Sequence, residues 1–281
     1  KGNRDNWSLS PSKIDEMNRL HQDSLKRVRN TSGTNTAATS GRAQSGTIPL
    51  MFYDSVLKNP ALKDARGYII PSDQPDLSTV IVFLNALVRT GIVVQKATAE
   101  FSVSGKKYPA NSYIVKTNQA FRPHVLDMFE PQDHPNDLQY PGGPPVPPYD
   151  AAGWTLAYQM GIKFDRITEA FEGPFVKNPN GQLLSVKGSK SDLTSPKGYV
   201  LDARSNQSYK AVNDLLDGGV EVFRITDPGN NSEHDYGSFY IPSNSSSNTI
   251  INKIINNYGV HFHAVSKRPF SLLKVNKARI A

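Results

Sequence analysis

The chain has 281 residues and a net charge of +7, with 37% hydrophobic residues, 20% charged residues and no cysteine. This composition is typical of a globular protein with a generous share of loops. The missing cysteines exclude disulfides, cysteine-ligated metal sites and thiol nucleophiles. No apolar run reaches the ~20 residues that cross a bilayer, so we predict no membrane span.

The positive charge lies at the two ends of the chain. Residues 1–43 hold eight basic and four acidic residues, and residues 253–281 hold six basic residues and no acidic one. The middle, 44–252, is slightly acidic, with 18 basic and 21 acidic residues. A nucleic-acid-binding domain gathers its charge on one structured face. Solvated end segments explain this pattern better, and we predict no nucleic-acid partner.

An N-terminal segment, 1–46, is predicted to hold a helix and a flexible linker. Pro11 suits the first position of a helix, and apolar residues recur at helical spacing as far as Arg29. The stretch 30–46 is rich in small polar residues and predicts a linker. The remaining 47–281 is predicted to form one α/β domain.

Within that domain, residues 67–95 predict a strand, a helix and a second strand. The run GYII is a short apolar strand, Asp76 is one of several candidate helix caps, and apolar residues at helical spacing follow it. A near copy occurs at 198–222, where GYVL echoes GYII, and both copies continue into a similar hairpin. We therefore predict two βαβ-plus-hairpin halves, at about 67–117 and 198–242.

Two βαβ units predict an α/β fold with a mainly parallel sheet sandwiched by helices. In the first half we expect a hairpin that turns at Gly105 and returns through Tyr113. An amphipathic helix over 247–258 and a strand over 260–265 are expected near the C-terminus.

A Pro-rich insertion, 121–150, separates the two halves. Seven prolines lie between Pro131 and Pro148, a density that excludes a regular helix or a central strand. Its aromatic and apolar residues favour order against a surface. The candidate binding residues of this surface are Arg122, His124, Asp127, Glu130, Asp133, His134 and Trp154.

The residues of the chain suggest three kinds of chemistry. His124, Asp127 and His234 offer a two-histidine, one-carboxylate metal site, but such side chains also satisfy backbone groups in Pro-rich segments, which is the preferred interpretation. The loops 71–76 and 202–206 offer a ligand site without a nucleotide-binding glycine pattern, and helix capping explains them better. No nucleophile elbow is present, and we predict no catalytic residue and no metal ligand.

The stretches GYIIPSDQPD, KYPANSYIVKTNQAFRPHVLDMFEPQDHPND and YPGGPPVPPYDAAGWTLAYQMGI resemble a region of large bacterial zinc carboxypeptidases, the carboxypeptidase A-like metallopeptidases. The resemblance covers nearly the whole chain. In that family the region lies between the zinc peptidase domain and a glutamine-amidotransferase-like domain, which implies a chain cut at both ends. The family's HxxE zinc motif is absent, since HVLD at 124–127 ends in Asp. The resemblance implies zinc in the parent's peptidase domain and no cofactor here.

The resulting prediction is a non-catalytic accessory or structural domain of a zinc carboxypeptidase-like metallopeptidase, whose parent hydrolyses C-terminal peptide bonds. Its expected partners are the neighbouring domains of the same polypeptide, with a peptide substrate as a second candidate. The resemblance implies a periplasmic or secreted location. Two alternatives stay open: an independent peptide- or glycan-binding module, and a metal-dependent hydrolase using His124, Asp127 and His234.

Overall fold

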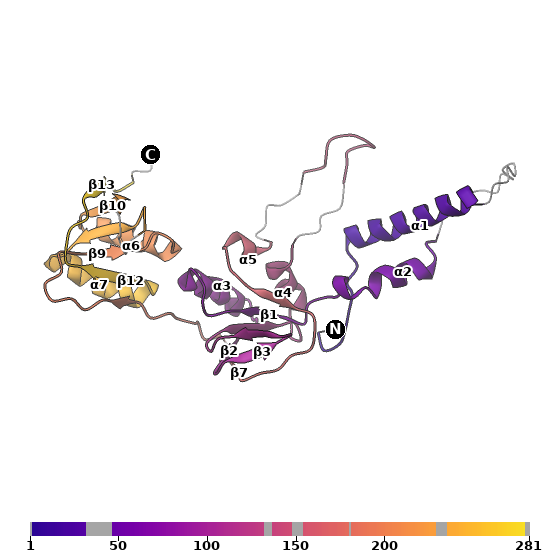
Figure 1. Ribbon diagram of the computed structural model, residues 1–281, viewed down its shortest axis with the longest axis horizontal. Helices are drawn as coiled ribbons and strands as arrows, with labels where there is room; N and C mark the ends of the chain where they lie inside the picture. Colours follow the sequence, from indigo (N-terminus) through magenta and orange to yellow (C-terminus); the bar gives the residue numbers. More distant parts are fainter. Residues whose placement is uncertain are drawn as a thin grey trace.

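The computed structural model describes residues 2–31, 47–131, 137–147, 154–179, 181–228 and 235–278. It shows two lobes and a helical arm that projects from the first lobe (Figure 1). The arm is formed by α1 (Pro11–Thr31) and α2 (Leu50–Leu57), and a short 3-10 turn (Pro60–Leu62) leads into the first lobe. Helix α1 confirms the helix predicted from Pro11 to Arg29. The predicted linker lies almost entirely outside the described residues.

The first lobe is built on a five-stranded sheet with the order β6-β1-β5-β2-β7, in which every pair of neighbours is antiparallel. A separate hairpin, β3–β4, covers part of it. The strands are β1 (Gly67–Ile70), β2 (Gln95–Ala97), β3 (Phe101–Val103), β4 (Lys106–Tyr108), β5 (Tyr113–Lys116), β6 (Asp165–Ile167) and β7 (Phe175–Lys177). The helices are α3 (Leu77–Arg89), α4 (Arg122–Phe129) and α5 (Leu156–Gln159).

The second lobe is built on a six-stranded sheet with the order β13-β10-β11-β9-β12-β8. Among the pairs of described strands, only β12 and β8 are parallel. The strands are β8 (Ser189–Lys190), β9 (Gly198–Leu201), β10 (Val222–Asp227), β11 (Phe239–Pro242), β12 (His261–Val265) and β13 (Ser271–Val275), and the helices are α6 (Asn206–Asp217) and α7 (Ser245–Tyr258). Helix α7 and strand β12 confirm the elements predicted over 247–258 and 260–265.

The prediction of a mainly parallel sheet is wrong, because a third strand enters each βαβ unit. Strands β1 and β2 run in the same direction, as expected, but they are not neighbours: β5 lies between them and is antiparallel to both. In the second lobe β11 lies between β9 and β10 in the same way. The sequence patterns of a βαβ unit and of this split βαβ unit are the same, since only the position of the following strand differs.

The two lobes repeat one another more fully than the sequence predicts. The order β6-β1-β5-β2-β7 matches β12-β9-β11-β10-β13, and the register is also the same: Tyr68 lies opposite Val115, as Tyr199 lies opposite Ile241. Further equivalent pairs are Gly67–Ile167 with Gly198–Val265, and Gln95–Lys177 with Phe223–Lys274. The repeat therefore extends over 67–177 and 198–275, each copy having the strand order of the ferredoxin-like topology.

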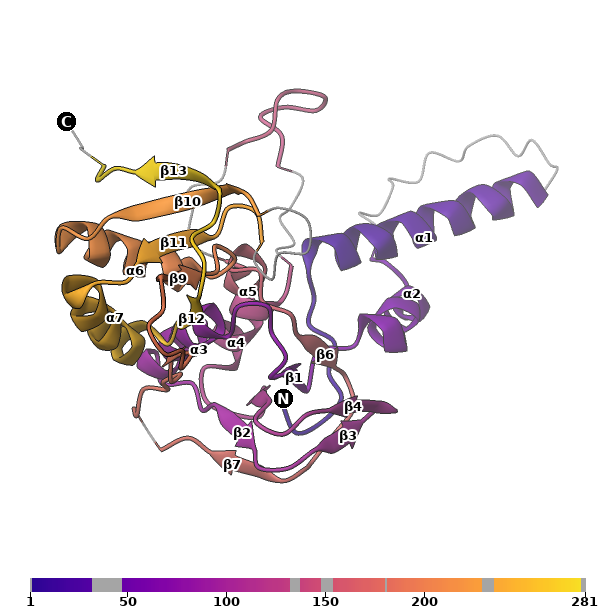
Figure 2. The same ribbon diagram turned by 60° about the vertical axis from the view of Figure 1, so that its left-hand side comes forward.

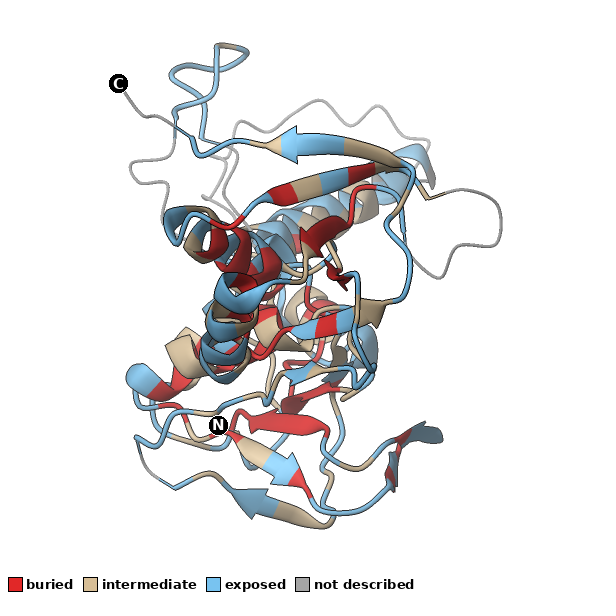
Figure 3. Ribbon diagram, turned by 90° about the vertical axis from the view of Figure 1, so that its left-hand side faces the viewer, coloured by how far each residue is buried: buried red, intermediate tan, exposed pale blue. Residues whose placement is uncertain are grey.

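Each sheet has its own core, and helices cover only one of its faces. Tyr68 and Ile70 of β1 face α3 and α4, whereas Ile69 between them packs on the opposite face against the β3–β4 hairpin. A sheet sandwiched by helices on both faces is therefore a wrong prediction. In the first lobe a β-hairpin covers the second face, and in the second lobe the cluster on that face consists of residues of the sheet strands. Figure 3 shows the central strands of both sheets buried, whereas the outer strands β7 and β13 hold only half-buried and exposed residues.

Two local predictions also need correction. The hairpin that turns at Gly105 returns immediately through β4, and Tyr113 instead begins the central strand β5. The Pro-rich insertion begins with a regular helix, α4, since its first part, before Pro131, holds only one proline, at the second helical position where proline is tolerated.

Candidate functional site

After α4, the described residues 137–147 of the Pro-rich insertion form a projecting turn. Leu138 and Pro145 make an isolated antiparallel bridge, and the amide of Val146 donates to the carbonyl oxygen of Asp137 at 2.8 Å. The turn stands away from the two lobes (Figure 1). The backbone of this segment is therefore closed by its own hydrogen bonds, without a helix or a sheet strand. Two predicted binding residues, Asp133 and His134, lie outside the described residues.

The side chains of this turn are notably apolar for a projecting segment. Three large apolar residues within eleven are largely exposed: Leu138 (45%), Tyr140 (61%) and Val146 (44%). The prolines around them restrict the backbone that carries these side chains. This surface is the candidate docking site, which we call the Pro-rich turn.

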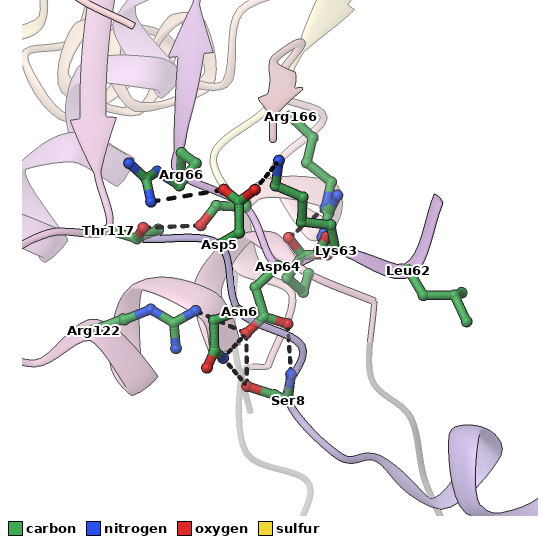
Figure 4. A network of polar contacts seen from close by, with 12 residues as sticks. Asp5, Asn6, Ser8, Leu62, Lys63, Asp64, Arg66, Thr117, Arg122 and Arg166 are labelled. Atoms are coloured by element: carbon green, nitrogen blue, oxygen red, sulfur yellow. Dashed lines mark hydrogen bonds and ion pairs between the residues drawn. The ribbon is translucent and has the colours of Figure 1, made fainter. Parts of the chain in front are cut away.

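Arg122, the first predicted binding residue, has a structural contact instead. Its Nη2 atom lies 3.0 Å from Oδ2 of Asp64, and both side chains are nearly buried. Asp64 also accepts hydrogen bonds from the side chain of Asn6 and from the amide and hydroxyl groups of Ser8 (Figure 4). Burial alone would raise the pKa of Asp64, but these donors outweigh it and hold the pKa below its ordinary value.

A second set of ion pairs lies beside this one. The buried ammonium group of Lys63 is 2.9 Å from both Asp5 and Glu169, and the nearby Arg66 faces Asp5 as well (Figure 4). Glu169 first and Asp5 second raise the pKa of Lys63 above its ordinary value. Together the two networks fix the N-terminal residues, and with them the arm, to the first lobe.

Glu130, another predicted binding residue, closes the end of α4. Its carboxylate accepts a hydrogen bond from the hydroxyl group of Tyr68 at 2.6 Å and one from Nε of Arg166 at 2.8 Å. Burial, followed by the negative charge of Glu130, raises the pKa of Tyr68 far above its ordinary value. Because Tyr68 is a core residue of β1, Glu130 serves the packing of α4 on the sheet.

His124 and Asp127 lie one helical turn apart on α4. The Nε2 atom of His124 lies 3.0 Å from the hydroxyl oxygen of Thr90, at the end of α3. Burial raises the pKa of Asp127, although the nearby His124 opposes the shift. His234, the third residue of the candidate metal site, lies outside the described residues. Within the described residues, no group of three metal-ligating side chains occurs.

A cavity of about 760 Å³ lies between the N-terminal segment and the start of α4. Arg122 and Asp127 both line it, together with Asn3, Asn118 and Phe121. Trp154 does not line it; this side chain is 41% exposed just before α5. The structure therefore brings together two of the seven predicted binding residues in this cavity.

The two βα loops considered for ligand binding meet at one carboxylate. Asp76 caps α3 by accepting from the amide of Thr79, and it also accepts from the amide of Asn206 and the hydroxyl group of Ser205, at the start of α6. Burial would raise the pKa of Asp76, yet these hydrogen bonds lower it. The negative charge that a helix N-terminus favours is thus supplied internally.

A cavity of about 420 Å³ lies beside this junction, lined by residues of both loops and by His261 and His263. The sequence indicates both loops but not the contact between them. A residue that caps two helices has the same local sequence pattern as a residue that caps one helix. The junction joins the two lobes. At the start of α6, next to Asp76, the backbone amides already have acceptors, so none is left free for a ligand.

Comparison with protein-family models, with curated proteins and with solved structures finds no match. The resemblance to zinc carboxypeptidases therefore stays a prediction. The fold consists of two copies of a split βαβ unit. None of the described helices is both long and apolar enough to cross a membrane.

Proposed function

We propose that this chain is a non-catalytic accessory domain that docks on another folded domain through the Pro-rich turn. The observation that supports it is the exposure of Leu138, Tyr140 and Val146 on a backbone that is closed by its own hydrogen bonds. Exposed apolar side chains on a restricted segment lose little conformational entropy on binding, which favours association.

The charged candidates around the turn support a docking role over a catalytic one. Arg122 contacts Asp64, and Glu130 contacts Tyr68 and Arg166, so these side chains already have structural partners. An acid or base whose hydrogen bonds hold a core residue in place is poorly available to a substrate. The exposed apolar side chains of the Pro-rich turn are therefore better candidates for contact with a partner than these charged residues.

The proposed partner is a neighbouring domain of the same polypeptide, as the resemblance to zinc carboxypeptidases implies. Under this proposal the parent is a zinc metallocarboxypeptidase of the periplasm or the extracellular space, and zinc belongs to its peptidase domain. The docking surface on the partner should be apolar and concave, with room for a tyrosine, because a buried tyrosine is a frequent anchor of protein interfaces.

The test is an affinity measurement between this chain and the separately produced peptidase domain. Replacing Leu138, Tyr140 and Val146 by Ser should weaken binding by about tenfold or more, since hot-spot residues carry most of the binding free energy. The matched control is Tyr236→Ser, because Tyr236 is 73% exposed but belongs to the second lobe. Equal affinity of the triple variant and the control would contradict the proposal.

A further inference from the structure

A cavity of about 490 Å³ lies on the helix-covered face of the first sheet, near the edge formed by β7. Its floor is a row of side chains from three neighbouring strands. Tyr113 of β5 lies opposite Lys96 of β2, and Lys96 lies opposite Val176 of β7. Side chains that lie directly opposite each other project from the same face of a sheet. The volume falls within the range of about 300–1,000 Å³ that is typical of small-molecule sites.

A second wall of the cavity comes from the segment that follows β7. This segment runs from β7 toward α3 (Figure 2), where the backbone of Leu184 makes two hydrogen bonds with the side-chain amide of Asn85, at 2.7 and 2.9 Å. At its start the amide of Asn178 donates to the carbonyl oxygen of Val94 at 2.9 Å. Leu184, Val94 and Pro179 all line the cavity, so this wall is apolar. Hydrogen bonds therefore hold the wall in place at both of its ends.

The hydroxyl group of Tyr113 has no hydrogen-bond partner among the described residues. Tyr113 is only 5% exposed, and burial alone raises its pKa. A buried tyrosine normally finds a partner for its hydroxyl group. Other buried tyrosines of the chain do so, since Tyr68 donates to Glu130 and Tyr199 donates to Asn248. The hydroxyl group of Tyr113, which lines the cavity, is therefore available to a molecule bound there.

The charge around the cavity is positive. Lys96 and Lys177 line it, and none of the described residues that line it is acidic. Within the described part of the chain Lys96 forms no ion pair, and its ammonium group lies 5.8 Å from the ring centre of Tyr113. A cation, an available hydroxyl donor and an apolar wall around one cavity suit a ligand that carries a negative group on an apolar body.

We infer that this cavity binds a small organic carboxylate that carries an apolar chain or ring. The carboxylate pairs with the ammonium group of Lys96 and accepts a hydrogen bond from the hydroxyl group of Tyr113. The apolar part of the ligand lies against Leu184 and Val176. Each unpartnered polar group of the cavity then has a partner, and the apolar wall is removed from water.

The second lobe provides an internal comparison. At the equivalent register Phe239 takes the place of Tyr113, and it lies opposite Arg224 instead of Lys96. The ring of Tyr209 packs edge-on against Phe239, with 5.4 Å between the ring centres. The phenylalanine offers no hydroxyl donor, and an aromatic side chain packs over it. We therefore expect no carboxylate binding at this place, which serves as the control.

Isothermal titration calorimetry of the whole chain with hydrocinnamate and with octanoate tests the inference. We expect at least one of the two to bind, and the stronger one shows whether a ring or a chain fits the apolar wall. The matched alcohols, hydrocinnamyl alcohol and octanol, should bind about tenfold more weakly or less, because they lack the charge. Lys96→Gln and Tyr113→Phe should each weaken carboxylate binding by about tenfold, since each removes one contact to a charged group.

Two control variants separate the site from a general effect of the changes. Arg224→Gln removes the equivalent cation of the second lobe, and Tyr199→Phe removes the hydroxyl group of another buried tyrosine. Both should bind the carboxylates as the unmodified chain does. Circular dichroism confirms that each variant is folded. No binding of either carboxylate, equal binding of the acids and the alcohols, or an unchanged affinity in either Lys96→Gln or Tyr113→Phe would overturn the inference.

Discussion

The two lobes share five strands in the same order and register, yet they differ in what their connections carry. In the second lobe a single helix, α7, fills the place before the fourth strand. In the first lobe this place holds α4 and α5, with the Pro-rich turn between them, and the first lobe also holds the β3–β4 hairpin and the arm. The repeated sheet is therefore a scaffold. The Pro-rich turn, which is the proposed docking surface, belongs to a segment that the first lobe has and the second lobe lacks.

The largest expected effect concerns the attachment of the arm, which the second lobe lacks. Asp64→Ala removes the carboxylate that binds Arg122, Asn6 and Ser8, and leaves a nearly buried guanidinium group unpaired. We expect a loss of about 3 kcal/mol in the free energy of unfolding of the first lobe, measured by urea unfolding. The matched control is Glu221→Ala in the second lobe, which should cost less because it breaks only an exposed ion pair with Lys274. An equal cost in both variants would contradict the anchoring role.

The junction between the lobes gives the next effect. Asp76→Ala deprives both α3 and α6 of a cap, at a cost of about 1 kcal/mol for each helix. Because the folded pKa of Asp76 is lowered, its contribution is complete above the ordinary carboxyl pKa of about 4 and is lost as the pH falls through the folded value. Unfolding measured from about pH 6 to about pH 3 should show a weaker pH dependence in Asp76→Asn than in the unmodified chain.

Equivalent tyrosines allow the sharpest comparison of the two cores. The hydroxyl group of Tyr68 donates to the charged Glu130 at 2.6 Å, whereas that of Tyr199 donates to the neutral Asn248 at 2.7 Å. Hydrogen bonds to charged groups contribute about twice as much as neutral ones. Tyr68→Phe should therefore cost about 2 kcal/mol and Tyr199→Phe about 1 kcal/mol. The reverse order in thermal unfolding would contradict a stronger hydrogen bond at Tyr68 than at Tyr199.

The smallest expected effect is shared by the two lobes. Lys96 lies 5.8 Å from the ring centre of Tyr113, and Arg224, at the equivalent place, lies 5.6 Å from that of Phe239. Replacing either cation by Gln should cost about 0.5 kcal/mol, as is typical of exposed cation–π contacts. Double-mutant cycles with Tyr113→Leu and Phe239→Leu measure both interactions, and a large difference between them would break the proposed equivalence.

Much of this architecture could be predicted from the sequence. The echo of GYII in GYVL indicated the repeat, and the apolar spacing indicated α3, α6 and α7. The sheet order could not be predicted, because β5 and β11 enter between strands that the local pattern only shows to be linked by a helix. The roles of Arg122 and Glu130 were missed for a similar reason, since their partners lie far away in the sequence.

Hydrogen exchange of the whole chain tests the central claim most directly, because it observes both lobes at once. The chain is compared alone and in the presence of the peptidase domain proposed as its partner. We predict slower exchange at the hydrogen-bonded amides of the Pro-rich turn, 137–147, and unchanged exchange over α7 in the second lobe. Protection of α7 without protection of the turn would contradict docking through the first lobe.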